Sequence, residues 1–244
     1  MTEWNRNVSG IYEISGEKII SKEHQKLIFL RREQFFYDLF QEGTLIKTPK
    51  IYSINGLNLQ TRFIETEPKN IYKTPEEWAK VHSHYLENPI VDNELIIKHD
   101  IEEVLSYISG NLDIFDSLGS VVEKKISRVR VRNDLRTILH GDLQQKNMVT
   151  FQQENYYFDF ELGGVGHPAR DIASMIISNP NEKENLLKIY KGYASFDYPE
   201  LREDVDAWLM ARAAQLYIIF DKRKGSERQK KPIKEKLSRI IEKM

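Results

Sequence analysis

The sequence contains no cysteine, which excludes disulfide bonds and thiolate metal sites. No apolar run approaches the roughly 18 residues that a transmembrane helix requires. The first seven residues lack the basic-then-apolar order of a secretory signal peptide. Positive and negative charges nearly cancel, with 36 Lys and Arg against 37 Asp and Glu, so no bulk attraction to nucleic acid is expected. We therefore expect a cytoplasmic protein that binds neither membrane nor nucleic acid, and its oligomeric state stays open.

The composition is that of a soluble globular protein. Its 244 residues can bury a sizeable core, and 40% of them are hydrophobic while 30% are charged. The charge is unevenly placed. Residues 65–123 hold 13 acidic and 4 basic side chains, a local charge of −9, whereas residues 222–244 hold 10 basic and 3 acidic ones, a local charge of +7. We interpret the basic tail as a solvated helix.

The most informative stretch runs from residue 140 to residue 171. Two short apolar runs flank a polar insert, which predicts a hairpin. Asp142 and Asn147 precede its first strand and Asp159 follows its second, so the hairpin should bring the three side chains together. Asn147 and Asp159 offer oxygen atoms suited to Mg²⁺, which takes few protein ligands. Asp142 is then left to orient and deprotonate a hydroxyl group, and this set of parts suits phosphoryl transfer. The alternative is that these residues are only turn formers and helix caps.

This stretch resembles the aminoglycoside phosphotransferase and choline kinase family. The matching residues are His140-Gly141-Asp142-Leu143, Asn147, Asp159-Phe160-Glu161 and Gly166-x-Pro168-x-x-Asp171-Ile172-Ala173. The resemblance covers roughly 35 residues. It implies an α+β, two-lobed protein-kinase-like fold with a small antiparallel β lobe and a larger, mostly helical lobe. We place the N-terminal nucleotide-binding lobe at residues 1–66 and the catalytic and substrate-binding lobe at residues 67–244.

The resemblance also implies an activity. We expect an ATP-dependent phosphotransferase that uses Mg²⁺, with GTP as a further possible donor. The acceptor would be a hydroxyl of a small molecule, such as an aminoglycoside-like antibiotic, an amino alcohol or a sugar. One alternative is a kinase-fold binding module without turnover; another is a protein kinase, although only 11 residues separate Asp159 from Asp171. Acidic residues after the hinge, with Glu200, Glu203, Asp204 and Asp206, could frame a cationic acceptor or could simply be solvated.

A lysine–glutamate pair is expected in the nucleotide-binding lobe. Glu33 falls in the middle of the apolar stripe of a helix predicted from residue 26 to about 41, where an unpaired carboxylate would be costly. Lys22 at the end of the preceding strand is the favoured partner, with Arg32 as an alternative. The resemblance implies that a lysine here reaches the nucleotide phosphates, and Lys18 is the second candidate. No glycine-rich phosphate loop is present; a turn at Ser9-Gly10 is the nearest substitute.

The predicted hinge follows a hairpin. Asn55-Gly56 is a strong turn signal between two strands, and the second strand ends at Glu65-Thr66-Glu67-Pro68. The resemblance implies that the backbone of Glu65, Thr66 and Glu67 binds the adenine. The rest of the chain is predicted to be mostly helical, including helices at 100–108, 112–131 and 204–221. Asp171 is expected to cap a helix, and the resemblance adds that it braces the catalytic loop.

Overall fold

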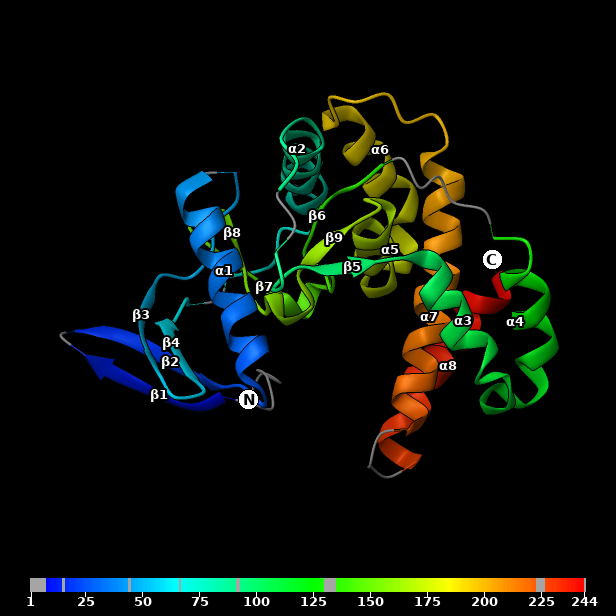
Figure 1. Cartoon of the computed structure of the whole chain (residues 1–244), viewed down its shortest axis with the longest axis horizontal. Helices are drawn as coiled ribbons and strands as arrows, with labels where there is room; N and C mark the ends of the chain where they lie inside the picture. The colour runs from blue at the N-terminus through cyan, green and yellow to red at the C-terminus, as the bar shows by residue number, and fades with distance from the viewer. Residues whose placement is uncertain are drawn as a thin grey trace.

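The chain folds into a β-rich N-terminal part and a mostly helical remainder (Figure 1). The computed structural model describes residues 8–14, 16–43, 45–65, 67–90, 93–129, 135–222 and 227–243. The predicted α+β fold class, with an antiparallel sheet followed by a mostly helical remainder, is confirmed. The division at residues 66 and 67 stays a prediction.

The N-terminal part is a four-stranded antiparallel sheet and one long helix. The sheet has the order β1-β2-β4-β3, and its strands are β1 (Val8–Ile14), β2 (Glu17–Glu23), β3 (Ile51–Asn55) and β4 (Asn58–Arg62). Helix α1 (Leu27–Gly43) connects β2 to β3. The predicted hairpin is confirmed, because Gly56 takes the positive φ of 61° that its turn requires. The predicted turn at Ser9-Gly10 is wrong: both residues lie within β1, where the register shifts.

The remainder of the described chain combines helices with two small sheets. The α-helices are α2 (Lys73–Glu87), α3 (Ile101–Ser109), α4 (Gly119–Ile126), α5 (Ala169–Ser178), α6 (Lys183–Tyr193), α7 (Leu201–Lys222) and α8 (Glu227–Lys243). Short 3₁₀ helices are η1 (Leu112–Leu118), η2 (Gln145–Asn147), η3 (Phe160–Leu162) and η4 (Pro180–Glu182). The strands β5 (Ile97–His99), β9 (Gly164–Gly166) and β6 (Thr137–Leu139) form one sheet in that order, and β7 (Met148–Phe151) pairs with β8 (Glu154–Tyr157) as the predicted hairpin.

Two predictions about the helices need correction. The continuous helix expected over 112–131 is instead the 3₁₀ helix η1 followed by α4, which ends at Ile126. The basic tail is a helix as predicted, but it is not simply solvated. Leu237, Ile240 and Ile241 of α8 are buried, and α8 packs along α7. Figure 1 shows these two helices side by side.

The core is continuous from α1 to the helices of the C-terminal part. Phe36 and Phe40 of α1 lie in one buried cluster with Trp78 of α2 and Trp208 of α7. Every helix within the described ranges is too short or too polar to span a lipid bilayer.

Candidate active site

The candidate catalytic loop, residues 140–147 between β6 and β7, is held by a glycine and a buried carboxylate. Gly141 has a φ of 81°, and a Cβ atom there would lie 1.8 Å from the Leu162 carbonyl oxygen, so no larger residue fits. The carboxylate of Asp171 accepts hydrogen bonds from the backbone N–H groups of His140 (2.7 Å) and Gly141 (3.0 Å). The predicted bracing of the loop by Asp171 is therefore confirmed. Its predicted role as the helix cap is wrong, because α5 begins at Ala169.

Asp142 lies in this loop and is surrounded by donors. Its Oδ1 accepts from Gln144 Nε2 (2.7 Å) and Arg212 Nη2 (2.9 Å). Its Oδ2 accepts from Lys146 Nζ (3.0 Å) and Asn147 Nδ2 (3.1 Å). Burial by itself would raise the pKa of Asp142, but Arg212 and Lys146 outweigh burial and hold this pKa well below its usual range. The carboxylate is thus ionised at neutral pH, with all of its lone-pair positions engaged.

Arg212 is the residue that the sequence pattern misses. It lies on α7, 70 residues after Asp142, and is only 3% exposed. A periodic helix predicts burial of some side chains but carries no signal that a particular arginine contacts a distant carboxylate.

The backbone links the segments that carry Asn147 and Asp159, and their joint role as metal ligands stays a prediction. The Phe158 N–H donates to the Asn147 carbonyl at 3.2 Å, which ties the two ends of the hairpin. Asn147 Nδ2 donates to the backbone carbonyl (2.8 Å) and the carboxylate of Asp142, which leaves the Asn147 amide oxygen as its possible metal ligand. Asp159 adopts a left-handed φ of 69° at the start of η3. An amide oxygen and a carboxylate oxygen at one site fit Mg²⁺, which prefers such ligands and keeps places for phosphate and water.

The predicted Lys22–Glu33 pair is confirmed. Lys22 Nζ lies 2.7 Å from Glu33 Oε2, 2.7 Å from Asp159 Oδ1 and 3.0 Å from Glu161 Oε1. Burial alone would lower the pKa of Lys22, but these three carboxylates raise it well above its ordinary value. The alternative partner, Arg32, instead donates to the backbone carbonyls of Leu95 and Glu161. The ammonium therefore stays charged and holds Asp159 in place.

Two further side chains support Glu33 and were missed by sequence reasoning. Tyr37 donates its hydroxyl to Glu33 at 2.8 Å from one turn along α1. His24 is fully buried, with Nε2 3.3 Å from Glu33 and Nδ1 3.1 Å from Glu161. These two carboxylates and His24 could surround a metal ion. Because Lys22 already supplies a cation to both carboxylates, we assign no metal there.

The phenylalanine of Asp159-Phe160-Glu161 connects the loops to α1. Its ring stacks on Phe36 with centroids 5.5 Å apart and on His140 with centroids 4.3 Å apart. This stacking fixes the segment that carries Asp159 against the helix that carries Glu33.

A cavity beside Lys22 has mainly apolar walls. The apolar lining residues include Ile20 of β2, Leu59 of β4 and Val149 of β7, together with Pro49, Ile64 and Phe158. Lys22 and Glu33 also line it. A mainly apolar cavity with a lysine among its lining residues suits a flat heterocyclic ring attached to a phosphate chain.

Two of the three predicted hinge residues, Glu65 and Glu67, make contacts within the protein. The Glu67 backbone N–H donates to the Thr150 carbonyl at 2.8 Å, so within this structure that donor is already engaged with the hairpin. The exposed carboxylate of Glu65 pairs with Lys18 at 2.7 Å. Lys18, the second candidate for the phosphate-binding lysine, is therefore engaged in this surface ion pair. Thr66 lies outside the described residues. The adenine contacts stay a prediction.

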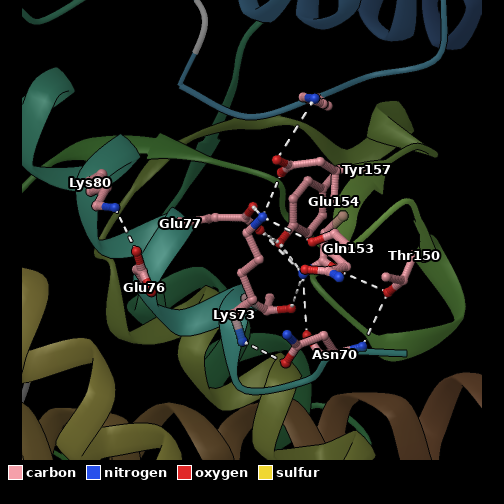
Figure 2. Close-up of polar contacts among 12 residues, drawn as sticks. Asn70, Lys73, Glu76, Glu77, Lys80, Thr150, Gln153, Glu154 and Tyr157 are labelled. Carbon is pink, nitrogen blue, oxygen red and sulfur yellow. Dashed lines mark hydrogen bonds and ion pairs between the residues drawn. The ribbon is translucent and has the colours of Figure 1, made fainter. Parts of the chain in front are cut away.

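A polar network fastens the chain after the hinge to the hairpin (Figure 2). The Tyr157 hydroxyl donates to Glu77 of α2 at 2.5 Å, and the Asn70 N–H donates to the Thr150 hydroxyl at 3.1 Å. The fully buried Asn155 joins the hairpin to α2. It accepts from the Thr150 hydroxyl and donates to Glu77 at 3.2 Å. Burial raises the pKa of the Glu77 carboxyl. The hairpin that carries the metal-binding candidates is thereby anchored to α2.

The acidic residues considered for a cationic acceptor are largely engaged elsewhere. Asp206 pairs with Lys183, and Asp204 accepts from Tyr198 at 3.1 Å and lies 3.4 Å from His167. Glu200 and Glu203 are exposed. None of these interactions directs a carboxylate toward Asp142.

Comparison with known proteins agrees with the resemblance seen in the sequence. Residues 118–203 match the phosphotransferase enzyme family, called APH. No curated protein matches the sequence. The fold resembles choline kinase LicA from Streptococcus pneumoniae, with 15% identity, a TM-score of 0.69, and 96% of this chain and 89% of that chain covered. It also resembles the amicoumacin kinase hAmiN, with 15% identity, a TM-score of 0.66, and 98% and 89% covered.

A third structure of the same fold is macrolide 2'-phosphotransferase MphH from Brachybacterium faecium, with 14% identity, a TM-score of 0.63, and 91% and 85% covered. At these identities the structures establish the fold alone. The family match contains Asp142, Asn147 and Asp159 in the predicted order. The match over residues 118–203 and the shared fold confirm the resemblance to the aminoglycoside phosphotransferase and choline kinase family.

Proposed function

We propose that this protein transfers the γ-phosphate of ATP to a hydroxyl group of a small molecule, with Mg²⁺ as the metal. One observation carries the proposal. Asn147 donates a hydrogen bond to Asp142 and is tied by the backbone to Phe158, next to Asp159, which Lys22 and Glu33 hold from the other side. A candidate hydroxyl-binding carboxylate and two candidate metal ligands thus form one connected site. GTP is the alternative donor.

Each residue of the site has a separate role in the proposed transfer. Lys22 neutralises phosphate charge, and Glu33 fixes its ammonium. The amide oxygen of Asn147 and the carboxylate of Asp159 would hold Mg²⁺, which when bound neutralises charge on the phosphate oxygens. The apolar cavity would take the base of the nucleotide, with hinge backbone at Glu65 to Glu67 beside it.

Asp142 serves the acceptor. The acceptor oxygen forms a bond to the γ-phosphorus while the bond between that phosphorus and the β–γ bridging oxygen breaks, leaving ADP. The hydroxyl proton passes to Asp142 as the new bond forms. Because the buried Arg212 keeps this carboxylate weakly basic, its main contribution is to align the hydroxyl until the proton becomes acidic late in the transfer.

One of the four donors around Asp142 has to leave before an oxygen of this carboxylate can accept a hydrogen bond from the acceptor hydroxyl. Among the four donors around Asp142, Lys146 has a side chain that is 60% exposed and can turn into solvent. We infer that the hydroxyl replaces the Lys146 ammonium at Oδ2. The structurally similar enzymes are named for choline, amicoumacin and macrolide acceptors, so a small-molecule acceptor fits. A protein kinase or a binding module without turnover has no comparable support.

The test is direct. A panel of small hydroxyl compounds is incubated with the protein, ATP and Mg²⁺, and phosphorylated products are identified by mass spectrometry. We expect a product that gains one phosphate group. The Asp142→Asn variant should reduce its formation by about 10²–10⁴-fold, because the group that aligns the hydroxyl and takes its proton is lost. Equal product formation by this variant, or no product from any compound while ATP binds, would contradict the proposal.

A further inference from the structure

Two buried arginines meet beside Asp142, and their donors are not all used. Arg170 of α5 and Arg212 of α7 are each only 3% exposed. Arg170 Nη2 donates to the Gly141 carbonyl at 3.3 Å, and Arg212 Nη2 donates to Asp142 at 2.9 Å. Both guanidinium groups therefore lie at the same turn of the catalytic loop.

The unpaired polar atoms here share one chemistry. Among the described residues, Arg170 Nε and Nη1, Arg212 Nε and the Trp208 indole nitrogen are buried without a hydrogen-bond partner. Trp208 belongs to the same place, because the Arg170 guanidinium lies over its ring at 5.5 Å. All four atoms are N–H donors, so the site has a surplus of donors. A carboxylate or phosphate is an acceptor with several lone pairs and would satisfy them.

The local charge points the same way. Arginine keeps its charge in proteins, so the two guanidinium groups repel each other, while Asp142 and Asp171 offset part of their positive charge. Burial, and then Arg170, lower the pKa of His99 to about 3, so this neighbouring side chain is neutral. Two of the acids considered for a cationic acceptor, Asp206 and Asp204, are paired with Lys183 and with His167 and Tyr198.

We propose that the acceptor carries an anionic group, a carboxylate or a phosphate, which Arg170 and Arg212 bind while its hydroxyl lies at Asp142. This inference rests on the proposed transfer reaction and specifies its substrate class. It departs from the amine and macrolide acceptors named for similar folds. An anion held between two buried guanidinium groups forms charge-assisted hydrogen bonds that a neutral group of the same size cannot form.

The experiment compares acceptors that differ only in charge. The three-carbon set is 3-hydroxypropanoate, 1,3-propanediol and 3-aminopropan-1-ol, and the sugar set is glucose 6-phosphate, glucose and glucosamine. The kcat/KM of each is measured from ADP release with the wild-type protein. We expect the anion of at least one set to exceed its neutral analogue by about 10- to 100-fold, the effect of a hydrogen bond to a charged group, and the amine to be poorest. The two sets separate a carboxylate from a phosphate.

Arg170→Gln tests the residue itself. It should bring the anion and its neutral analogue to within about threefold of each other, while Arg170→Lys, which keeps the charge if glutamine does not fold, should retain part of the preference. Arg202→Gln is the matched control, because Arg202 is a largely exposed residue of α7 paired with Glu184. It should leave the preference unchanged. A wild-type preference for the amine or the neutral compound, or an unchanged preference in Arg170→Gln, would overturn the inference.

Failure of the proposed function gives a different result. If no compound accepts phosphate, the transfer proposal fails, and calorimetric titration with 3-hydroxypropanoate and with inorganic phosphate decides the anion site. Binding that Arg170→Gln abolishes would support the site. Absence of binding to the wild-type protein would refute it.

Discussion

Lys22 is the central residue of the candidate nucleotide site, because three carboxylates lie within 3.0 Å of its ammonium. Lys22→Ala should therefore leave Glu33, which is 1% exposed, as an uncompensated buried charge. Loss of one partner from a buried ion pair costs about 3–5 kcal/mol, so the free energy of unfolding should fall by that order. The affinity for ATP should fall as well. Urea denaturation measures the first effect and calorimetric titration the second.

Lys18 provides the control for this prediction. It lies on the same strand, β2, but its ion pair with Glu65 is exposed. Lys18→Ala should change neither stability nor ATP affinity appreciably, since exposed pairs contribute little. If Lys18→Ala weakens ATP binding and Lys22→Ala does not, the assignment of the phosphate-binding lysine is wrong.

His99 predicts a pH dependence of stability. Because its pKa in the folded protein is about 3, below the ordinary 6.5, the folded state holds the neutral ring. Its contribution to stability is therefore complete above about pH 6.5 and is lost as pH falls from 6.5 toward 3. The largest slope that one such group gives is about 1.4 kcal/mol per pH unit.

His99→Asn should remove this dependence. An asparagine amide can still donate to the Leu162 carbonyl that His99 contacts at 2.8 Å. Unfolding free energies at pH 7, 6 and 5 should thus fall less steeply for the variant than for the wild-type protein. Parallel curves for the two proteins would show that His99 titrates normally.

The hairpin β7–β8 works as an anchored element, and its two tyrosines test this. Tyr157 is fully buried and donates to Glu77, whereas Tyr156 on the opposite face is only half-buried. Tyr157→Phe should cost about 1–3 kcal/mol of unfolding free energy, because Glu77 would lose a buried donor. Tyr156→Phe should cost much less. Thermal or urea denaturation of both variants measures these unfolding free energies. Equal losses of unfolding free energy in the two variants would mean that the network does not anchor the hairpin.

At the level of elements, local sequence patterns predicted much of the fold. The hairpin at Asn55-Gly56, helix α1 and helix α7 follow from turn residues and apolar periodicity. The error at Ser9-Gly10 has a physical cause: strand pairing with β2 absorbs the glycine as an irregularity in register. The break between η1 and α4 falls at Gly119, a helix-weakening residue that the apolar periodicity on both sides outweighed in the prediction.

Across the whole molecule, the parts of the site that are close in sequence could be predicted and the distant parts could not. Asp142, Asn147 and Asp159 lie within 18 residues and form a motif. Glu33 was found because an acid in an apolar stripe requires a partner. Arg170 and Arg212 gave no such signal, since their meeting at Gly141 and Asp142 depends on how α5 and α7 pack. Tertiary packing therefore adds to the motif the two arginines that the sequence could not predict.

The most direct test of the account is calorimetric titration of ATP, with and without Mg²⁺, into the wild-type protein and the Asp142→Asn and Asp159→Asn variants. Because Asp159 is assigned to the metal and Asp142 to the acceptor, the wild-type protein and Asp142→Asn should both bind ATP more tightly with Mg²⁺. Asp159→Asn should lose that enhancement. An Asp159→Asn variant whose ATP affinity depends on Mg²⁺ as strongly as that of the wild-type protein would contradict the account, because the metal would then be held elsewhere.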